Sequence, residues 1–403
     1  MSVTIKKVQK ALNTLKGVIK ETNLIYSNTF SEICNNQIYL KPENLQKTGS
    51  FKIRGAYNKI AGLPENEREN SNGVIASSAG NHAQGVAYAA THYGIKSTIV
   101  MPREAPIAKV TATKNYGAEV VLHGDSYDEA YNKARSIQRE TESVFVHPFD
   151  DEDVIAGQGT ISLEILEELP DTDIIVVPIG GGGLISGMAL AAKSICPEIK
   201  IVGVEAAGAS IMRESLKKGQ IDNLDKVSTI ADGIAVKKPG KITFDLCKKY
   251  LDEIVTVDEE EIANAILMLL ERTKMVVEGA GATSLAALLN NKIGNEGKKI
   301  VALLSGGNID VNVISRIIER GLIKADRRMT INTRVKDKPG NLQKLLSIIA
   351  ELGANVISIT HNHSHPGVPI NDAMVKLELE VKDKEHSRRI VTVLSENGYI
   401  MKF

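Results

Sequence analysis

Short apolar runs rich in valine and isoleucine alternate along most of the chain with longer segments of helical periodicity. The clearest runs comprise residues 173–178, 200–205 and 299–304, and glycine or charged residues bound them. Continuous β-branched runs of this length are typical of parallel strands buried on both faces. Their alternation with helices, from about residue 74 to residue 322, predicts an α/β fold with helices on both sides of a parallel sheet.

The same pattern predicts the elements between these runs and the N-terminus. We expect strands at residues 74–76, 97–101 and 118–122, and helices at residues 83–93 and 106–116. Parallel sheets bind their ligands beyond the carboxyl ends of the strands. Side chains that directly follow a predicted strand are therefore the first candidates for chemistry.

The pattern changes near residues 324–328, a short charged segment that is the best candidate for a linker. After it the predicted order is strand, helix, strand, strand, helix and a short final strand, which is typical of a ferredoxin-like domain. These elements fall at residues 329–335, 342–352, 356–361, 372–381 and 385–396, followed by the final strand. We therefore predict two domains, at residues 1–324 and 328–403.

The composition indicates an ordinary globular protein and excludes several partners. The 403 residues include 49 basic and 49 acidic side chains, so the net charge of zero favours neither nucleic acid nor a membrane as partner. No apolar run approaches the ~18 residues of a membrane span, and the first residues lack the apolar core of a signal peptide. Three cysteines, Cys34, Cys196 and Cys247, lie far apart in the sequence. We expect a reduced, cytoplasmic protein.

One lysine, Lys52, stands in a small-residue segment between Phe51 and a glycine. Most lysines are surface charges, so this segment alone is weak support for a site. Three distant segments strengthen it, namely Ser-Ser-Ala-Gly-Asn-His at 77–82, four glycines at 180–183 and Ser-Gly-Gly-Asn at 305–308. A lysine, an asparagine loop, a phosphate cradle and a hydroxyl donor are together the groups that hold pyridoxal phosphate, whose aldehyde forms a Schiff base with a lysine amine.

The glycine run at 180–183 lies between a predicted strand and an amphipathic helix that begins near Leu184. Four glycines let backbone N–H groups turn toward one anion, and the helix N-terminus adds a favourable partial charge. The alternative is a tight turn between strand and helix. The run is neither a dinucleotide fingerprint nor a P-loop, because it lacks the residues that follow the glycines in both motifs.

The loop at 77–82 lies at a predicted helix start. Ser78, the Gly80 amide and Asn81 are expected to be unpaired donors there, which suits a substrate carboxylate, and the Asn81 amide could also reach a phenolic oxygen. An ordinary N-cap is the competing interpretation, since serine and asparagine favour that position. His82 is as well explained by a structural role.

Ser305 directly follows the last predicted buried strand. Its hydroxyl can donate to an unprotonated pyridine nitrogen. A neutral partner makes the ring a weaker electron sink than an aspartate would, which suits elimination and disfavours transamination. The alternative is a glycine-rich turn that only ends the strand.

These four segments, in this order and at these spacings, resemble the threonine dehydratase (threonine ammonia-lyase) family of fold type II pyridoxal-phosphate enzymes, which share a tryptophan synthase β-like fold. The likeness runs from about residue 22 to residue 320. It implies a catalytic domain at residues 1–324, with a smaller subdomain inserted at about 50–147. The segment after residue 328 resembles an ACT domain, with Asp-Lys-Pro-Gly at 337–340 in its first turn.

The resemblance also implies roles for individual residues. Lys52 is the Schiff-base lysine and the catalytic residue. The residues implied to bind the cofactor are Phe51, Lys52, Asn81, Gly180, Gly181, Gly182, Gly183, Leu184 and Ser305. The residues implied to bind the substrate carboxylate are Ser78, Gly80, Asn81 and His82.

Two positions depart from patterns of related enzymes. Serine racemases resemble this family and carry a second serine where this chain has Ala79, so only one face of the substrate is expected to meet a proton carrier. Related enzymes with a divalent cation use a glutamate and a carboxylate six residues later. Here Glu205 is followed by Ile211, so the sequence leaves the presence of a metal open.

The resemblance implies deamination of L-threonine to 2-oxobutanoate and ammonia, with L-serine as a side substrate. A serine racemase, another fold type II lyase acting on diaminopropionate or hydroxyaspartate, and an amino-acid sensor without activity are the alternatives. The ACT-like segment implies a homo-oligomer, a tetramer or a dimer. It also implies that a small allosteric effector, such as a branched-chain amino acid, changes the activity. The sequence does not decide between isoleucine biosynthesis and threonine catabolism.

Overall fold

The computed structural model describes residues 3–65, 72–294, 296–364 and 366–402. The chain divides into two compact units, Met1–Asp310 and Val311–Phe403. The second unit begins with helix α14 (Val311–Lys324), a segment that the sequence prediction placed in the first domain. Among the described residues, no helix is both long and apolar enough to cross a membrane.

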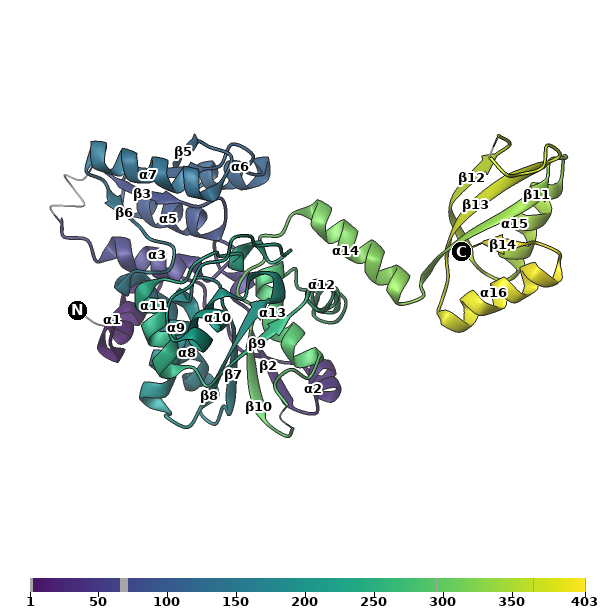
Figure 1. Cartoon of the computed structure of the whole chain (residues 1–403). Coiled ribbons are helices and arrows are strands. Elements are labelled where there is room, and N and C mark those ends of the chain that lie inside the picture. Colours follow the sequence, from purple (N-terminus) through teal and green to yellow (C-terminus); the bar gives the residue numbers. More distant parts are fainter. Residues whose placement is uncertain (1–2, 66–71, 295, 365, 403) are drawn as a thin grey trace. The chain divides into compact units, whose positions relative to one another are not determined.

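A six-stranded sheet forms the base of the first unit, in the order β1-β2-β10-β7-β8-β9 (Figure 1). Its strands are β1 (Ile25–Tyr26), β2 (Gln37–Lys41), β7 (Ile174–Pro178), β8 (Lys200–Ala206), β9 (Glu253–Val257) and β10 (Lys299–Leu303). Every neighbouring pair is parallel except β1 and β2. The predicted parallel sheet is therefore confirmed for its centre, and the pattern missed the antiparallel edge and β9.

The apolar side chains of β7 and its neighbours explain why these strands lie at the centre of the six-stranded sheet. All five residues of β7 are buried, so the strand meets apolar neighbours on both faces. Alternate residues such as Ile175, Val177 and Val301 share one core with helices α8 (Glu152–Glu168) and α9 (Gly183–Ile195). Helix α13 (Gly279–Leu289) packs against β7, β8, β9 and β10. Since successive side chains point to opposite faces, helices cover the sheet on both sides as predicted.

A second, wholly parallel sheet is built from the chain between β2 and β7, in the order β5-β4-β3-β6. Its strands are β3 (Val74–Ser77), β4 (Ser97–Met101), β5 (Glu119–Leu122) and β6 (Val144–Phe145). The predicted strands 74–76, 97–101 and 118–122 correspond to the first three. Helices α3 (Lys52–Ala61) and α5 (Asn81–His92) pack closely on each other, and α6 (Ile107–Asn115) and α7 (Tyr127–Thr141) complete this part (Figure 1).

The remaining elements of the first unit surround the large sheet. The α-helices are α1 (Ile5–Leu15), α2 (Asn28–Cys34), α10 (Ile211–Lys218), α11 (Lys241–Tyr250) and α12 (Glu259–Met268). Short helical turns are η1 (Glu43–Leu45), η2 (Ala207–Ala209), η3 (Asp232–Ile234) and η4 (Leu269–Thr273). Of these, η1 and η3 contribute to the surroundings of the site.

The second unit contains one antiparallel sheet in the order β12-β13-β11-β14. After α14, its elements are β11 (Arg328–Lys336), α15 (Asn341–Glu351), β12 (Asn355–Asn362), β13 (Asp372–Glu380), α16 (Lys384–Glu396) and β14 (Met401–Lys402). The β-α-β-β-α-β order predicted for this segment is therefore observed. Ile331, Val375 and Leu377 of the sheet pack against Leu345 and Ile390 of the two helices in a core of its own.

Candidate active site

Lys52 is the first residue of helix α3, and the segment that follows β10 holds it in place. The Phe51 N–H donates to the carbonyl oxygen of Ser305 at 3.1 Å, and the Gly307 N–H donates to Gly49 at 2.8 Å. These bonds join the lysine segment to the serine segment from the far end of the unit. The sequence prediction that both belong to one site is consistent with this pairing.

A buried ion-pair network anchors the start of α3. Arg54 is fully buried, and its Nε and Nη2 donate to the two carboxylate oxygens of Glu43 at 2.8 Å each. Nη2 also donates to Glu164 of α8 at 2.8 Å. Because a buried arginine needs such partners, loss of either carboxylate would leave a costly unpaired charge. The network therefore fixes the helix turn that carries Lys52.

One cavity of about 1510 Å³ opens beyond the carboxyl ends of β3, β7 and β10. It brings together every site residue that the sequence predicted. These are Phe51, Lys52, Ser78, Gly80, Asn81, His82, Gly180, Gly181, Gly182, Gly183, Leu184 and Ser305. The three strand ends meet there because β7 and β10 are neighbours in the large sheet and the second sheet faces the same space.

The Lys52 amine points toward carbonyl and aromatic groups. Its Nζ donates to the carbonyl oxygen of Pro148 at 2.8 Å and lies 5.3 Å from the centre of the Phe51 ring. Burial lowers the pKa of this amine to about 8, and the Glu278 carboxylate opposes part of that shift. A lysine with a lowered pKa has a larger neutral fraction near neutral pH and can act as a nucleophile or base.

Glu278 is a site residue that the sequence interpretation missed. It caps helix α13, it is 4% exposed, and its N–H donates to the Gly306 carbonyl oxygen at 3.0 Å. Burial raises the pKa of its carboxyl to about 7, and the Asp232 carboxylate adds to the shift. A glutamate directly before a run of glycine and alanine was the available signal, but it resembles an ordinary helix start.

Both the nitrogen and the oxygen of the Asn81 side-chain amide form hydrogen bonds within the protein. Its Nδ2 donates to Oε1 of Glu278 at 2.7 Å, and its Oδ1 accepts from Nδ2 of Asn308 at 2.7 Å. The expectation of unpaired donors in this loop is therefore wrong for this side chain. It is also wrong for the Gly80 N–H, which donates to Oγ of Ser78 at 3.2 Å. Glu278 and Asn308 come from distant segments, so the loop sequence gave no sign of them.

His82 is buried, 2% exposed, with its Nε2 2.9 Å from the carbonyl oxygen of Val146. Burial lowers the pKa of this imidazole to about 3, and the neighbouring Lys52 amine adds to the shift. The ring is therefore neutral, with Nε2 donating to Val146. Its Nδ1 has no partner among the described residues.

The glycine run adopts a conformation that other residues would disturb. Gly182 has φ of +92°, a left-handed value that favours glycine, and a Cβ on Gly181 would lie 2.4 Å from Cδ1 of Phe149. In the described part of the chain, the backbone N–H groups of Gly181 to Leu184 donate to no other residue. A tight loop with free N–H groups at the start of α9 fits an anion such as phosphate.

Ser305 is 2% exposed and lines the same cavity. Its hydroxyl has no hydrogen-bond partner among the residues that the structure describes. A lysine of lowered pKa, a free glycine cradle and a free buried hydroxyl form a donor set that fits pyridoxal phosphate.

Glu205 lies away from these groups, at the end of β8. Both its oxygens accept backbone N–H groups, from Met212 at 2.8 Å and Arg213 at 2.9 Å, at the start of α10. Burial raises the pKa of its carboxyl to about 7. In the structure the residue thus caps the start of α10.

Residues 15–306 match the family described as pyridoxal-phosphate dependent enzyme. The chain therefore belongs to the family of pyridoxal-phosphate-dependent enzymes, and its first unit has their type II α/β fold. It is a lyase of this family and uses pyridoxal phosphate as its cofactor.

The curated relatives of this chain are named for threonine ammonia-lyase or threonine dehydratase activity. The L-threonine ammonia-lyase of Thermotoga maritima is 57% identical over 397 residues, which cover 98% of both chains. The L-threonine dehydratase catabolic TdcB of Escherichia coli is 46% identical over 319 residues, which cover 79% of this chain and 96% of that protein. Among solved structures, maize serine racemase superposes with a TM-score of 0.75 at 37% identity, covering 80% of this chain and 99% of that one.

Proposed function

We propose that this chain is an L-threonine ammonia-lyase that converts L-threonine to 2-oxobutanoate and ammonia, with L-serine as a side substrate. The observation that carries the proposal is the buried Lys52 amine, which shares one cavity with the free glycine cradle and the Ser305 hydroxyl. The 57% identity to an L-threonine ammonia-lyase over nearly the full chain supports the substrate. Formation of 2-oxobutanoate by the purified protein tests it.

Different residues of the cavity would bind the cofactor and transfer the substrate proton. Lys52 would hold the cofactor covalently, the glycines with Leu184 would hold its phosphate, and Phe51 would pack on its ring. When bound, pyridoxal phosphate supplies a conjugated ring that accepts the electron pair left at the α-carbon of the substrate. Lys52 Nζ, once free, takes the α-proton.

Other groups of the cavity would set the position of the ligands. The Ser305 hydroxyl would donate to the pyridine nitrogen and leave it unprotonated. Asn81 would meet the cofactor 3-hydroxyl, and the Glu278 and Asn308 bonds fix its amide for that contact. The loop of Ser78, Gly80, Asn81 and His82 would bind the substrate carboxylate, for which the Gly80 N–H must leave Ser78.

Glu278→Gln is expected to move the acid side of the kcat profile to lower pH. The ionised Glu278 raises the pKa of Lys52 against the effect of burial, so removing that charge lowers the pKa below its value of about 8. Lys52 must be neutral to accept a proton, and its neutral fraction then persists to lower pH. Gln keeps an oxygen that accepts from Asn81. Steady-state kcat from pH 6 to pH 9 checks this shift, and a profile moved to higher pH contradicts it.

Ala79 favours a lyase over a racemase. Racemase activity is the alternative function that the similarity to maize serine racemase suggests. Ala79 lines the cavity but carries no group that can deliver a proton. Elimination without racemisation is therefore expected. Chiral chromatography of the L-serine that remains after half conversion should show almost no D-serine, whereas Ala79→Ser should raise the D-serine fraction. Substantial D-serine from the unmodified enzyme would show that another group protonates the second face.

We further propose that the second unit is an ACT-type regulatory module, because of its β-α-β-β-α-β topology and the Asp-Lys-Pro-Gly turn between β11 and α15. Among the residues that the structure describes, the outer strand β12 has a partner strand on one side only, so one edge of the sheet is open. A second copy could pair with that edge and form a site for a small amino acid. The proposal thus includes a homo-oligomer, a tetramer or a dimer, in the cytoplasm.

Removal of all residues after Ala325 is expected to leave an active enzyme whose turnover does not change when effectors are added. The Escherichia coli relative matches 79% of this chain while being covered over 96% of its own length, which supports independent folding of the first unit. Threonine turnover of both forms, measured with isoleucine, valine and nucleotides in turn, checks the expectation. An identical effector response in the truncated and complete enzymes would remove the regulatory role.

A further inference from the structure

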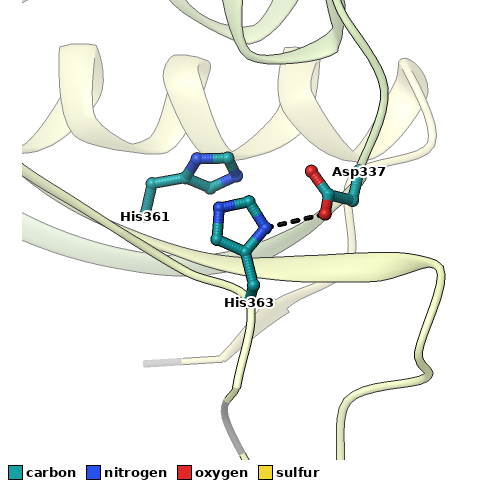
Figure 2. A group of neighbouring side chains, drawn as sticks. All are labelled: Asp337, His361 and His363. Carbon is teal, nitrogen blue, oxygen red and sulfur yellow. Dashed lines mark hydrogen bonds and ion pairs between the residues drawn. The ribbon is translucent and has the colours of Figure 1, made fainter.

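Three side chains with metal-binding atoms meet on the surface of the second unit, away from the cavity residues in sequence. They are Asp337, His361 and His363, and each offers one ligand atom within 4.8 Å of the others (Figure 2). In the part of the chain that the structure describes, no other group of three or more His, Cys, Asp or Glu side chains meets this spacing.

The fold brings these residues together from two segments. His361 is the penultimate residue of β12 and His363 is the first residue after that strand, and their ring centres lie 4.6 Å apart. Asp337 directly follows β11, and its N–H donates to the Asn371 carbonyl oxygen at 2.9 Å. Strand β13 lies between β11 and β12 in the sheet, and Figure 2 shows the three side chains converging across this end.

An ordinary surface ion pair explains only part of this arrangement. His363 Nδ1 lies 2.7 Å from Oδ2 of Asp337, as an ion pair requires. The His361 ring, however, contacts that pair without a hydrogen bond of its own among the described residues, and its centre is 4.6 Å from the centre of the His363 ring.

The spacing is compatible with a small ion. Two ligands of a tetrahedral metal with bonds of about 2.0–2.1 Å lie about 3.3–3.4 Å apart. The observed 2.7 Å between His363 and Asp337 must therefore open slightly, and the wider pairs within the 4.8 Å limit must close. All three side chains are exposed, so these changes need only rotation about side-chain bonds.

We propose that Asp337, His361 and His363 bind a divalent transition-metal ion, with water completing its coordination. Two imidazoles and one carboxylate suit Zn²⁺, Ni²⁺ or Co²⁺ and disfavour Mg²⁺ and Ca²⁺, which prefer oxygen ligands. The ion would clamp the turn after β11 to the end of β12. All three residues belong to the second unit, and the proposal does not depend on the proposed function.

Isothermal titration of Zn²⁺ into the complete, chelator-washed holoenzyme tests the proposal. The expected result is one ion per chain that is lost in both His361→Ala and His363→Ala. Asp337→Asn should weaken this binding by about 10-fold or more, because even residues that only orient metal ligands typically contribute about 10- to 100-fold in affinity. The control His123→Ala removes a partly exposed imidazole of the first unit and should bind as the unmodified protein does.

Binding to cysteine thiols or to the cofactor would survive the two histidine substitutions, so the lost equivalent belongs to the cluster. Because the side chains are exposed, these variants should keep their circular dichroism and threonine turnover. The proposal is overturned if the unmodified protein binds no Zn²⁺ that His361→Ala lacks. Equal affinity for Mg²⁺ at the same site would also overturn it.

Discussion

Replacement of Lys52 by alanine is expected to abolish turnover and to remove the visible absorbance of the bound cofactor. The amine is the covalent attachment point and also the group that takes the α-proton, so one substitution removes both functions. Loss of a proton-transfer group alone typically costs about 10²–10⁴-fold in rate. The absorbance spectrum of the dialysed protein and its rate of 2-oxobutanoate formation measure the two effects separately.

Lys47→Ala is the matched control, because Lys47 is an exposed lysine of the neighbouring segment whose side-chain amine lies next to Tyr88 and whose carbonyl oxygen, kept in the variant, accepts from Tyr116. It should keep both the cofactor spectrum and the turnover. Normal activity in Lys52→Ala would contradict the assignment of the catalytic lysine and, with it, the interpretation of the whole cavity.

Gly181→Ala is expected to lower cofactor affinity by about 10- to 100-fold. The added Cβ would lie 2.4 Å from Cδ1 of the Phe149 ring, well inside the contact distance, so the loop must move away from its cradle conformation. Overpacking of this kind costs about 1–3 kcal/mol, which corresponds to that change in affinity. Titration of the apoenzyme with pyridoxal phosphate, followed by absorbance, gives the dissociation constants.

Gly62→Ala provides the comparison, since Gly62 ends α3 at a φ of −78° and an added Cβ there meets the Asn58 carbonyl oxygen at 3.3 Å. It should change cofactor affinity little. Shortening the opposing ring, as in Gly181→Ala with Phe149→Leu, should restore part of the binding. If Gly181→Ala binds the cofactor as tightly as the unmodified enzyme, the loop does not form the cradle.

The strands next to the site could be predicted because each buried strand is an uninterrupted apolar run in the local sequence. Residues 174–178 are apolar at every position, and the structure buries all of them on both faces of the sheet. Ser305 and the glycine run follow such strands directly, so their convergence on one cavity follows from parallel pairing. The β-α-β-β-α-β order of the second unit could be predicted as well, because β11 and β13 alternate buried and less buried positions and α15 and α16 each bury one face.

The contacts that complete the site were not visible in the sequence. Glu278 reaches Asn81 only because the N-terminal ends of α13 and α5 lie next to each other in the folded unit, and the local sequence around either residue does not indicate this. The pairing of Gly80 with Ser78 depends on loop dihedrals rather than on residue type. The same holds for Asp337, whose nearness to His361 and His363 results from the order of three strands in the sheet.

Steady-state turnover of L-threonine by the purified, cofactor-saturated protein tests the central claim most directly. We expect equimolar 2-oxobutanoate and ammonia, with a kcat in the common enzymatic range of about 1–10³ s⁻¹, and slower formation of pyruvate from L-serine. A protein that binds pyridoxal phosphate at Lys52 but releases no 2-oxobutanoate from L-threonine would contradict the account.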